Sequence, residues 1–143
     1  MKSFTFYSPT EVIFGKGTEL KVSEEIKKHG GTRVLIVYGG GSAVKSGLLG
    51  KVQDSIKKAG LLCISVGGVK PNPRVSFVRE AVKKAVDFKA DFILAVGGGS
   101  VIDTAKGIAH GTANPEIDVW KFWKHEAELK ISMPVGVILT ISG

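Results

Sequence analysis

The fold expected for this chain follows from one stretch, FILAVGGGSVIDTAK at residues 92–106. Its apolar run, together with the preceding Asp91, predicts a strand at residues 91–96 that is covered on both faces. The three glycines then form a turn, and a helix is expected from Ser100 to about Gly111. This order of strand, glycine turn and helix is typical of a parallel sheet whose crossover helices cover its faces.

The same order recurs on both sides of this stretch. Further strands are expected at residues 33–38, 61–66 and 134–140, and further helices at residues 18–29, 47–59 and 75–88. The runs at residues 33–38, 61–66 and 91–96 are apolar nearly throughout, which predicts three central strands that are buried on both sides. Residues 4–6 and 12–14 predict two short strands near the amino terminus.

The chain is therefore expected to form one domain, residues 1–143, because its length suits a single hydrophobic core. The predicted fold class is α/β: a doubly wound, mainly parallel, Rossmann-like sheet with helices on both faces, preceded by a short N-terminal β segment. The aromatic segment at residues 119–123 is interpreted either as core packing or as an exposed patch.

Charge and composition argue against several classes of protein. The net charge is +7, but the lysines come mostly as pairs on predicted helices and no run of five like charges occurs, so no nucleic-acid partner is expected. No apolar stretch reaches ~18 residues, and the amino terminus lacks the apolar core of a signal peptide. No membrane partner is therefore expected, and the expected location is cytoplasmic. The single cysteine, Cys63, is expected to be a buried structural thiol.

Two triple-glycine turns follow predicted strands, Gly39-Gly40-Gly41-Ser42 and Gly97-Gly98-Gly99-Ser100. Open α/β sheets bind their ligands at the carboxyl ends of the strands. Glycine leaves backbone N–H groups open to an anion, and the N-terminus of the helix that follows attracts negative charge. The two turns together are therefore a candidate cradle for a pyrophosphate.

Other interpretations of these loops remain open. Neither turn is the GxGxxG fingerprint, because Val44 and Ile102 stand where its last glycine would be, and neither is a P-loop. Ser100 is alternatively a helix cap, with Asp103 closing a capping box three residues later. The loop Pro71-Asn72-Pro73 is either a rigid turn or a clamp whose Asn72 binds an adenosine.

Catalytic side chains are scarce in this sequence. His29, His110 and His125 are far apart and have no partners at metal-ligand spacing. A zinc or iron site needs at least three converging protein ligands. No catalytic and no metal-binding residue is therefore assigned in this chain.

Five motifs, taken in order, resemble the iron-containing (group III) alcohol dehydrogenase family, especially its butanol dehydrogenase and aldehyde reductase branch. They are FxFxxPTxVxFGKGT at residues 4–18, VYGGGSxxxSG at 37–47, GGVKPNPR at 67–74, FILAVGGGSVIDTAK at 92–106 and PVGVILT at 134–140. The resemblance covers nearly the whole chain. It implies hydride transfer between a small primary alcohol or aldehyde and NAD(P), with a divalent metal, iron or zinc, polarising the substrate oxygen.

The resemblance also implies cofactor-binding roles by position. The residues that would hold the pyrophosphate or lie beside the nicotinamide are Gly97, Gly98, Gly99, Ser100 and Asp103. Those that would surround the adenosine ribose, or contact the cofactor after the last strand, are Gly39, Gly40, Gly41, Ser42, Asn72 and Thr140.

Gly39 bears on the choice between NAD and NADP. NAD-specific members of the family often carry an acidic residue at this position, which binds the ribose hydroxyls and repels a 2′-phosphate. Here glycine stands there, with Ser42 as a donor and Lys45 as a nearby cation. NADP is therefore expected in preference to NAD.

One departure from the family limits what this chain is expected to do. The family continues into a helical domain that carries the metal ligands, an Asp and three His, whereas this sequence stops at Gly143. The chain is accordingly interpreted as a truncated dinucleotide-binding domain that binds no metal and lacks turnover alone, with a homodimer as a candidate assembly. The alternative is a non-redox nucleotide or sugar-phosphate binding module.

Overall fold

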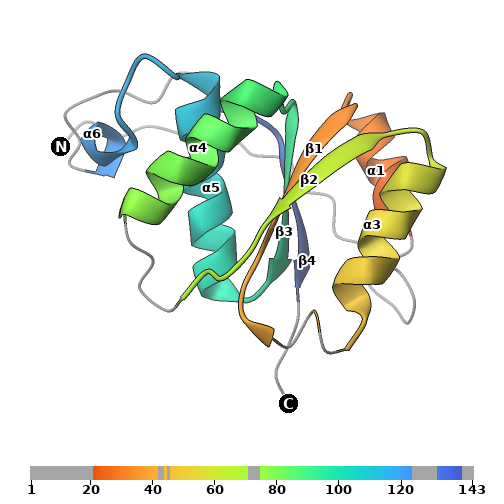
Figure 1. Cartoon of the computed structure of the whole chain (residues 1–143). Coiled ribbons are helices and arrows are strands. Elements are labelled where there is room, and N and C mark those ends of the chain that lie inside the picture. Colours follow the sequence, from red (N-terminus) through yellow and green to blue (C-terminus); the bar gives the residue numbers. More distant parts are fainter. Residues whose placement is uncertain (1–20, 42–43, 45, 71–74, 124–131, 140–143) are drawn as a thin grey trace, which may run out of the picture.

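The computed structural model describes residues 21–41, 44, 46–70, 75–123 and 132–139. Four parallel strands lie in the order β2-β1-β3-β4, namely β1 (Arg33–Tyr38), β2 (Leu62–Val66), β3 (Phe92–Gly97) and β4 (Val135–Leu139). The described helices are α1 (Val22–Lys28), α3 (Leu48–Lys58), α4 (Val75–Phe88), α5 (Gly99–Ala113) and α6 (Val119–Trp123). In Figure 1, α4, α5 and α6 lie on one side of the sheet and α1 and α3 on the other. None of these helices is long and apolar enough to cross a membrane.

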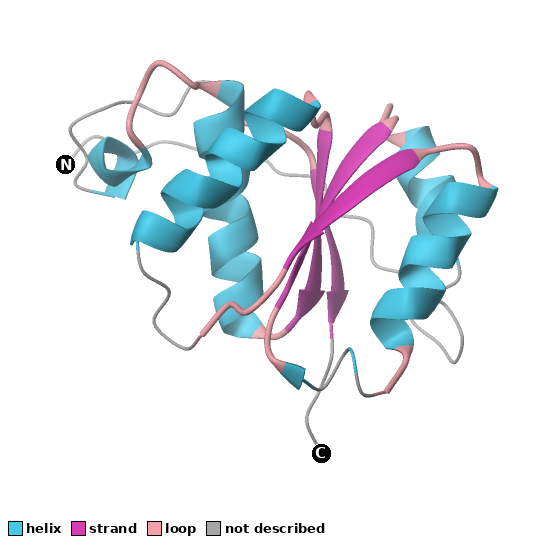
Figure 2. Cartoon of the chain, viewed as in Figure 1, coloured by secondary structure: helices cyan, strands magenta, loops and turns pink. Residues whose placement is uncertain are grey.

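The sheet lies between two layers of helices (Figure 2). A hydrophobic core lies under each layer. Successive side chains of a strand point to opposite faces. Leu35 and Val37 of β1 therefore join the core under α4 and α5, whereas Val34 and Ile36 join the core under α1 and α3. All four are 0% exposed. The structure confirms the α/β, doubly wound, parallel fold.

Two expectations about burial are wrong. β2 is an outer strand of the described sheet and pairs with β1, so Leu62 is 52% exposed. Cys63, which lies on β2, is only partly buried; this burial raises the pKa of its thiol, and nearby Lys57 acts in the opposite direction. An apolar run of six residues indicates a strand but does not show whether that strand lies at the centre or the edge of the sheet. The order of strands depends on pairing between distant segments of the chain.

The bounds of the elements follow the sequence pattern closely. α4 begins and ends as expected, and the four strands, α3 and α5 agree with their expected bounds to within two residues. The expected strands at residues 4–6 and 12–14, and the expected beginning of the first helix at residues 18–20, lie outside the described residues.

α1, α3 and α4 end in the same hydrogen-bonded motif. In each, a buried residue after the helix donates its N–H to a carbonyl five residues earlier: Gly31 to Ile26 (2.8 Å), Leu61 to Ile56 (3.2 Å) and Ala90 to Ala85 (2.9 Å). This is the Schellman motif, which places the preceding residue in the left-handed conformation. Gly30 and Gly60 occupy that position with φ of 83° and 82°, but α4 has Lys89 there, with φ of 60°.

Asp91 ties the beginning of β1 to the beginning of β3. Its carboxylate accepts the N–H groups of Thr32 (2.9 Å) and Arg33 (2.8 Å) and the Thr32 hydroxyl (2.5 Å). Its own N–H donates to the Arg33 carbonyl (2.9 Å). Burial alone would raise the pKa of Asp91, but the hydrogen bonds to its charged form together outweigh burial and hold the pKa below its ordinary value.

The aromatic segment at residues 119–123 forms α6, and it bears out both interpretations in part. Val119 is 4% exposed, whereas Trp120 is 42% exposed. A Cβ on Gly111 would come within 2.5 Å of Val119 Cγ1 and 2.6 Å of Val82 Cγ2. Glycine at residue 111 therefore allows α4, α5 and α6 to make direct contact.

Candidate functional site

The two glycine turns lie side by side at one edge of the sheet. β1 and β3 are neighbours and run parallel, with Tyr38 opposite Val96 at their carboxyl ends. The turn at residues 39–41 follows β1, and the turn at residues 97–99 follows β3 and leads into α5. In the order β2-β1-β3-β4, β1 and β3 are also the pair at which the chain reverses its direction of winding, where open α/β sheets bind ligands.

One side chain, Val101, lies against both turns. A Cβ on Gly97 would come within 2.7 Å of Val101 Cγ2, and a Cβ on Gly39 would lie 3.3 Å from the same atom. Val101 belongs to the first turns of α5 and is 5% exposed. Gly97 has φ of 154° as well, so both its backbone conformation and its surroundings require glycine. The pattern of the sequence did not single out Val101, which resembles any apolar position on a buried helix.

The loop after β2 joins the same edge. The N–H of Gly68 donates to the carbonyl of Gly39 (3.2 Å), and the N–H of Val69 donates to the carbonyl of Tyr38 (3.4 Å). Val69 is 6% exposed, and the ring of Tyr38 occupies the space that a side chain on Gly67 would need. The carboxyl ends of β1, β2 and β3 therefore form one continuous surface.

α5 begins at this surface without a side-chain cap. Its N-cap is Gly98, with φ of −102° and ψ of −160°, and this residue makes no side-chain hydrogen bond that would cap the helix. The interpretation of Ser100 as a cap is therefore wrong: Ser100 lies inside the helix, where its carbonyl accepts the hydroxyl of Thr104 (2.8 Å). The first N–H groups of a helix have no partner within the helix, so those of α5 are available to a ligand.

Three glycines of the turns have no structural requirement for glycine. A Cβ on Gly40, Gly98 or Gly99 would meet no heavy atom of the described residues within 4 Å, and none of the three has a positive φ. The adjacent Gly97 differs in both respects, because a Cβ there would clash with Val101 and its φ is positive. The open glycines leave a space in front of the N-terminus of α5 that a side chain would fill. A pyrophosphate that approaches the backbone N–H groups fits such a space.

The described residues account for most of the predicted site. Those that the structure places at this edge or on the first turns of α5 are Gly39, Gly40, Gly41, Gly97, Gly98, Gly99, Ser100 and Asp103. Asp103 is exposed on α5. Ser42, Asn72 and Thr140 lie outside the described residues, as does Lys45.

Histidines do not contribute to this edge within the described part of the chain. His110 lies in the second half of α5, where its Nδ1 is 2.8 Å from Ser132 Oγ; burial and, to a lesser degree, Lys106 lower its pKa. The Nδ1 of His29 contacts the carbonyl of Glu25 at the end of α1 (2.9 Å). Among the described residues, no three His, Cys, Asp or Glu side chains are grouped so that they could hold a metal ion.

The fold and this edge define the chain as a doubly wound α/β protein with glycine turns at the switch point of a parallel sheet. The chain belongs to the iron-containing alcohol dehydrogenase family, whose sequence pattern matches residues 9–143.

Individual relatives agree with this assignment. The chain is 44% identical over 142 residues to a probable NADH-dependent butanol dehydrogenase 1 of Bacillus subtilis, covering 99% of this chain and 36% of the relative. It is 41% identical over 143 residues to the NADPH-dependent aldehyde reductase YqhD of Escherichia coli, with the same coverage. The crystal structure of NADH-dependent butanol dehydrogenase A from Thermotoga maritima superposes with a TM-score of 0.90 at 46% identity, covering 99% of this chain and 35% of that one. The chain thus spans 36% of the length of these curated relatives.

Proposed function

We propose that residues 1–143 form the dinucleotide-binding domain of a metal-dependent alcohol dehydrogenase or aldehyde reductase. The observation that carries this proposal is the set of open glycines, Gly40, Gly98 and Gly99, in front of the uncapped N-terminus of α5. Neither packing against the described residues nor backbone conformation explains glycine at these positions, whereas close approach of a phosphate to the backbone does. Named relatives are dependent on NADH or NADPH.

The residues present fit a dinucleotide. The N–H groups at residues 98–100 would hold the pyrophosphate, and residues 39–41 with Ser42 would surround the adenosine ribose. Asn72 would lie beside the adenosine, and Asp103 and Thr140 beside the rest of the cofactor. When bound, the nicotinamide supplies the hydride acceptor or donor, and this domain would fix its position at the edge of the sheet.

We further propose that the domain prefers NADP. A side chain on Gly39 would have to fit between Val101 Cγ2, 3.3 Å away, and the carbonyl of Val69, 3.7 Å away. This crowding disfavours the acidic residue that would repel a 2′-phosphate. The named relatives include both NADH-dependent and NADPH-dependent enzymes, so relatedness alone does not choose between them.

The described residues do not fit the catalytic metal of the family. No group of three ligating side chains occurs among them, and three converging protein ligands are what iron or zinc requires. We therefore propose that the described residues bind cofactor and that the ligands of any catalytic metal lie elsewhere. No chemical step through a metal is assigned to this edge of the sheet.

Two neighbouring alanine substitutions test the dinucleotide site. Gly98→Ala places a methyl group in open space, so the free energy of unfolding is expected to change by no more than about 0.5 kcal/mol. NADPH affinity is expected to fall at least about tenfold, because the methyl group keeps the phosphates from the N–H groups. Gly97→Ala meets Val101 at 2.7 Å and is expected to destabilise the fold by about 1–3 kcal/mol.

Titration calorimetry with NADPH and urea unfolding would measure both quantities on the same proteins. The proposal fails if the starting chain binds neither NADPH nor NADH. It also fails if Gly98→Ala binds NADPH as tightly as the starting chain does. Gly50→Ala serves as the matched control, because it also adds a methyl group in open space but lies on α3 and not in the glycine turns.

A further inference from the structure

The loop at residues 67–70 is held against the first glycine turn. Two hydrogen bonds, from the N–H of Gly68 to the carbonyl of Gly39 and from the N–H of Val69 to the carbonyl of Tyr38, fix its backbone (3.2 and 3.4 Å). Val69 anchors it in the core with 6% exposure. The carbonyl of Val69 lies 3.7 Å from the position of a Cβ on Gly39. The next residue, Lys70, is therefore placed beside the turn at residues 39–41.

Lys70 is the only charged residue in the three loops that meet at this edge, residues 38–41, 67–70 and 97–100. It is exposed, and it makes no hydrogen bond or ion pair with the described part of the chain. An ammonium group on a flexible stem, attached to a fixed backbone, can reach an anion held above the neighbouring turn. Within the described residues its charge is thus unpaired, and it lies on the side of the site where the adenosine ribose would bind.

We propose that Lys70 is the residue that makes the site prefer a 2′-phosphorylated dinucleotide. This inference rests on the proposed function and adds a specificity-determining residue to it. A 2′-phosphate carries between one and two negative charges near neutral pH. An ammonium donor beside it stabilises NADP but contributes little to NAD, whose ribose bears only hydroxyl groups.

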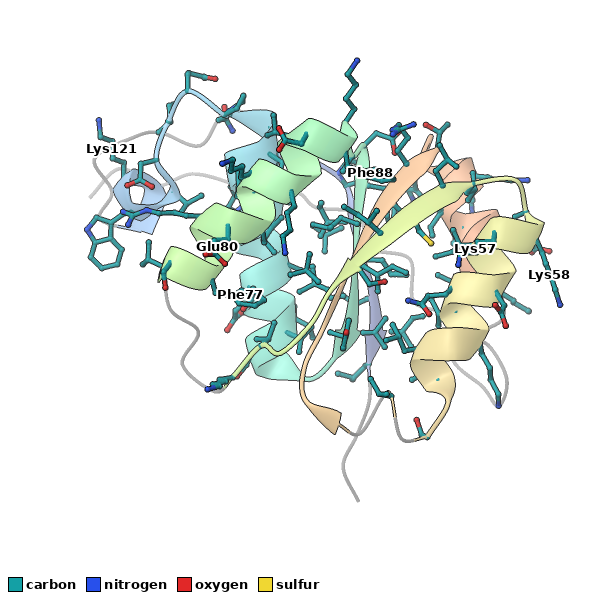
Figure 3. All side chains as sticks on the ribbon, viewed as in Figure 1. Lys57, Lys58, Phe77, Glu80, Phe88 and Lys121 are labelled. Carbon is teal, nitrogen blue, oxygen red and sulfur yellow. The ribbon has the colours of Figure 1, made fainter. Side chains whose placement is uncertain are left out.

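The test compares four lysine variants of the full chain, namely Lys70→Met, Lys70→Arg, Lys45→Met and Lys58→Met, in titrations with NADPH and with NADH. Lys70→Met is expected to weaken NADPH binding about tenfold and to change NADH binding by less than about twofold. Lys70→Arg keeps the charge and is expected to restore most of the NADPH affinity. Lys58→Met is the control, because it removes the same charge at the end of α3; Figure 3 shows Lys58 on the helix layer opposite α4 and α5.

Several outcomes would overturn the assignment. Equal weakening of NADPH and NADH binding by Lys70→Met would mean that residue 70 acts on the shape of the loop. An unchanged NADPH affinity, or a selective loss that follows Lys45→Met instead of Lys70→Met, would assign the 2′-phosphate to another group. If the starting chain binds neither dinucleotide, the proposed function itself fails and this inference fails with it, whereas binding of both with no selectivity change refutes Lys70 alone.

Discussion

Replacement of Lys89 by glycine is expected to stabilise the protein. Lys89 adopts φ of 60° in the Schellman motif that ends α4, whereas Gly30 and Gly60 occupy the same position after α1 and α3. The hydrogen bonds of the three motifs are alike: the N–H of Lys89 donates to Val86 (3.0 Å), as that of Gly60 donates to Lys57 (3.0 Å). The three helix ends therefore differ chiefly in whether the left-handed residue carries a Cβ.

The magnitude follows from two opposing effects. A residue with a Cβ is less stable than glycine in the left-handed conformation by about 1–2 kcal/mol. Glycine increases the conformational freedom of the unfolded chain, which opposes the gain by about 0.4–1 kcal/mol. The net stabilisation is expected to be about 0.5–1 kcal/mol, or roughly 2–4 °C in Tm for a chain of this size.

Urea unfolding followed by circular dichroism would measure this difference. Gly60→Lys is the reciprocal variant: a Cβ there meets no heavy atom of the described residues within 4 Å, so the loss of about 1 kcal/mol reflects backbone conformation alone. Lys84→Gly, on the exposed side of α4, is expected to destabilise by about 1 kcal/mol and controls for loss of a lysine from this helix. A Lys89→Gly variant that is no more stable than the starting chain would refute the reasoning.

Two further predictions concern the ends of β1. Gly39→Asp is expected to bind NADPH about three- to tenfold more weakly than Gly39→Asn, because the two side chains are equal in size and a carboxylate about 6 Å from a 2′-phosphate of one to two charges repels it by about 0.7–1.4 kcal/mol in water. Equal affinities in a fluorescence titration would contradict the role given to charge at residue 39. Asp91→Asn is expected to be less stable than the starting chain by roughly 1 kcal/mol at neutral pH, after allowance for solvent screening. Because the pKa of Asp91 is lowered in the folded state, its contribution is present above the ordinary carboxyl pKa and is lost as the pH falls through the lowered value; urea unfolding at neutral and acidic pH would check this, and a difference that persists in acid would contradict it.

The elements of the fold could be predicted because their signals are local. The helices that precede β1 and β2 end at Gly30 and Gly60. The apolar runs match buried strands, since residues 34–37 of β1 and 92–96 of β3 are 0–5% exposed. The order of the strands could not be predicted from local signals. β1 and β2 have similar composition, and β1 is central only because it also pairs with β3. The exposure of Leu62 and Cys63 therefore could not be inferred from their own neighbours in the sequence.

The candidate site divides in the same way. The glycine turns could be found from residue type, because glycine after a strand has few structural explanations. Their place at one edge was predicted from the carboxyl ends of a parallel sheet. The contacts between them were not, because they depend on Val101 and Val69, whose apolar side chains look like ordinary core residues in the sequence. The helix cap shows the opposite error: Ser100 and Asp103 match a capping box by spacing, but the N-cap of α5 is Gly98, two residues earlier than that pattern requires.

Under the proposed function, the position of Val101 constrains how the preference for NAD or NADP can change in evolution. Its Cγ2 occupies space that a larger residue 39 needs, so substitutions at residues 39 and 101 are not independent. Shrinking Val101 first leaves a void beside Gly97 in the core, and enlarging residue 39 first crowds the turn. Either single step lowers stability, and the second step then recovers part of the loss. A protein that exchanges one dinucleotide for the other in this way therefore passes through a less stable intermediate. The exchange is accessible only if its free energy of unfolding exceeds the loss caused by the first substitution.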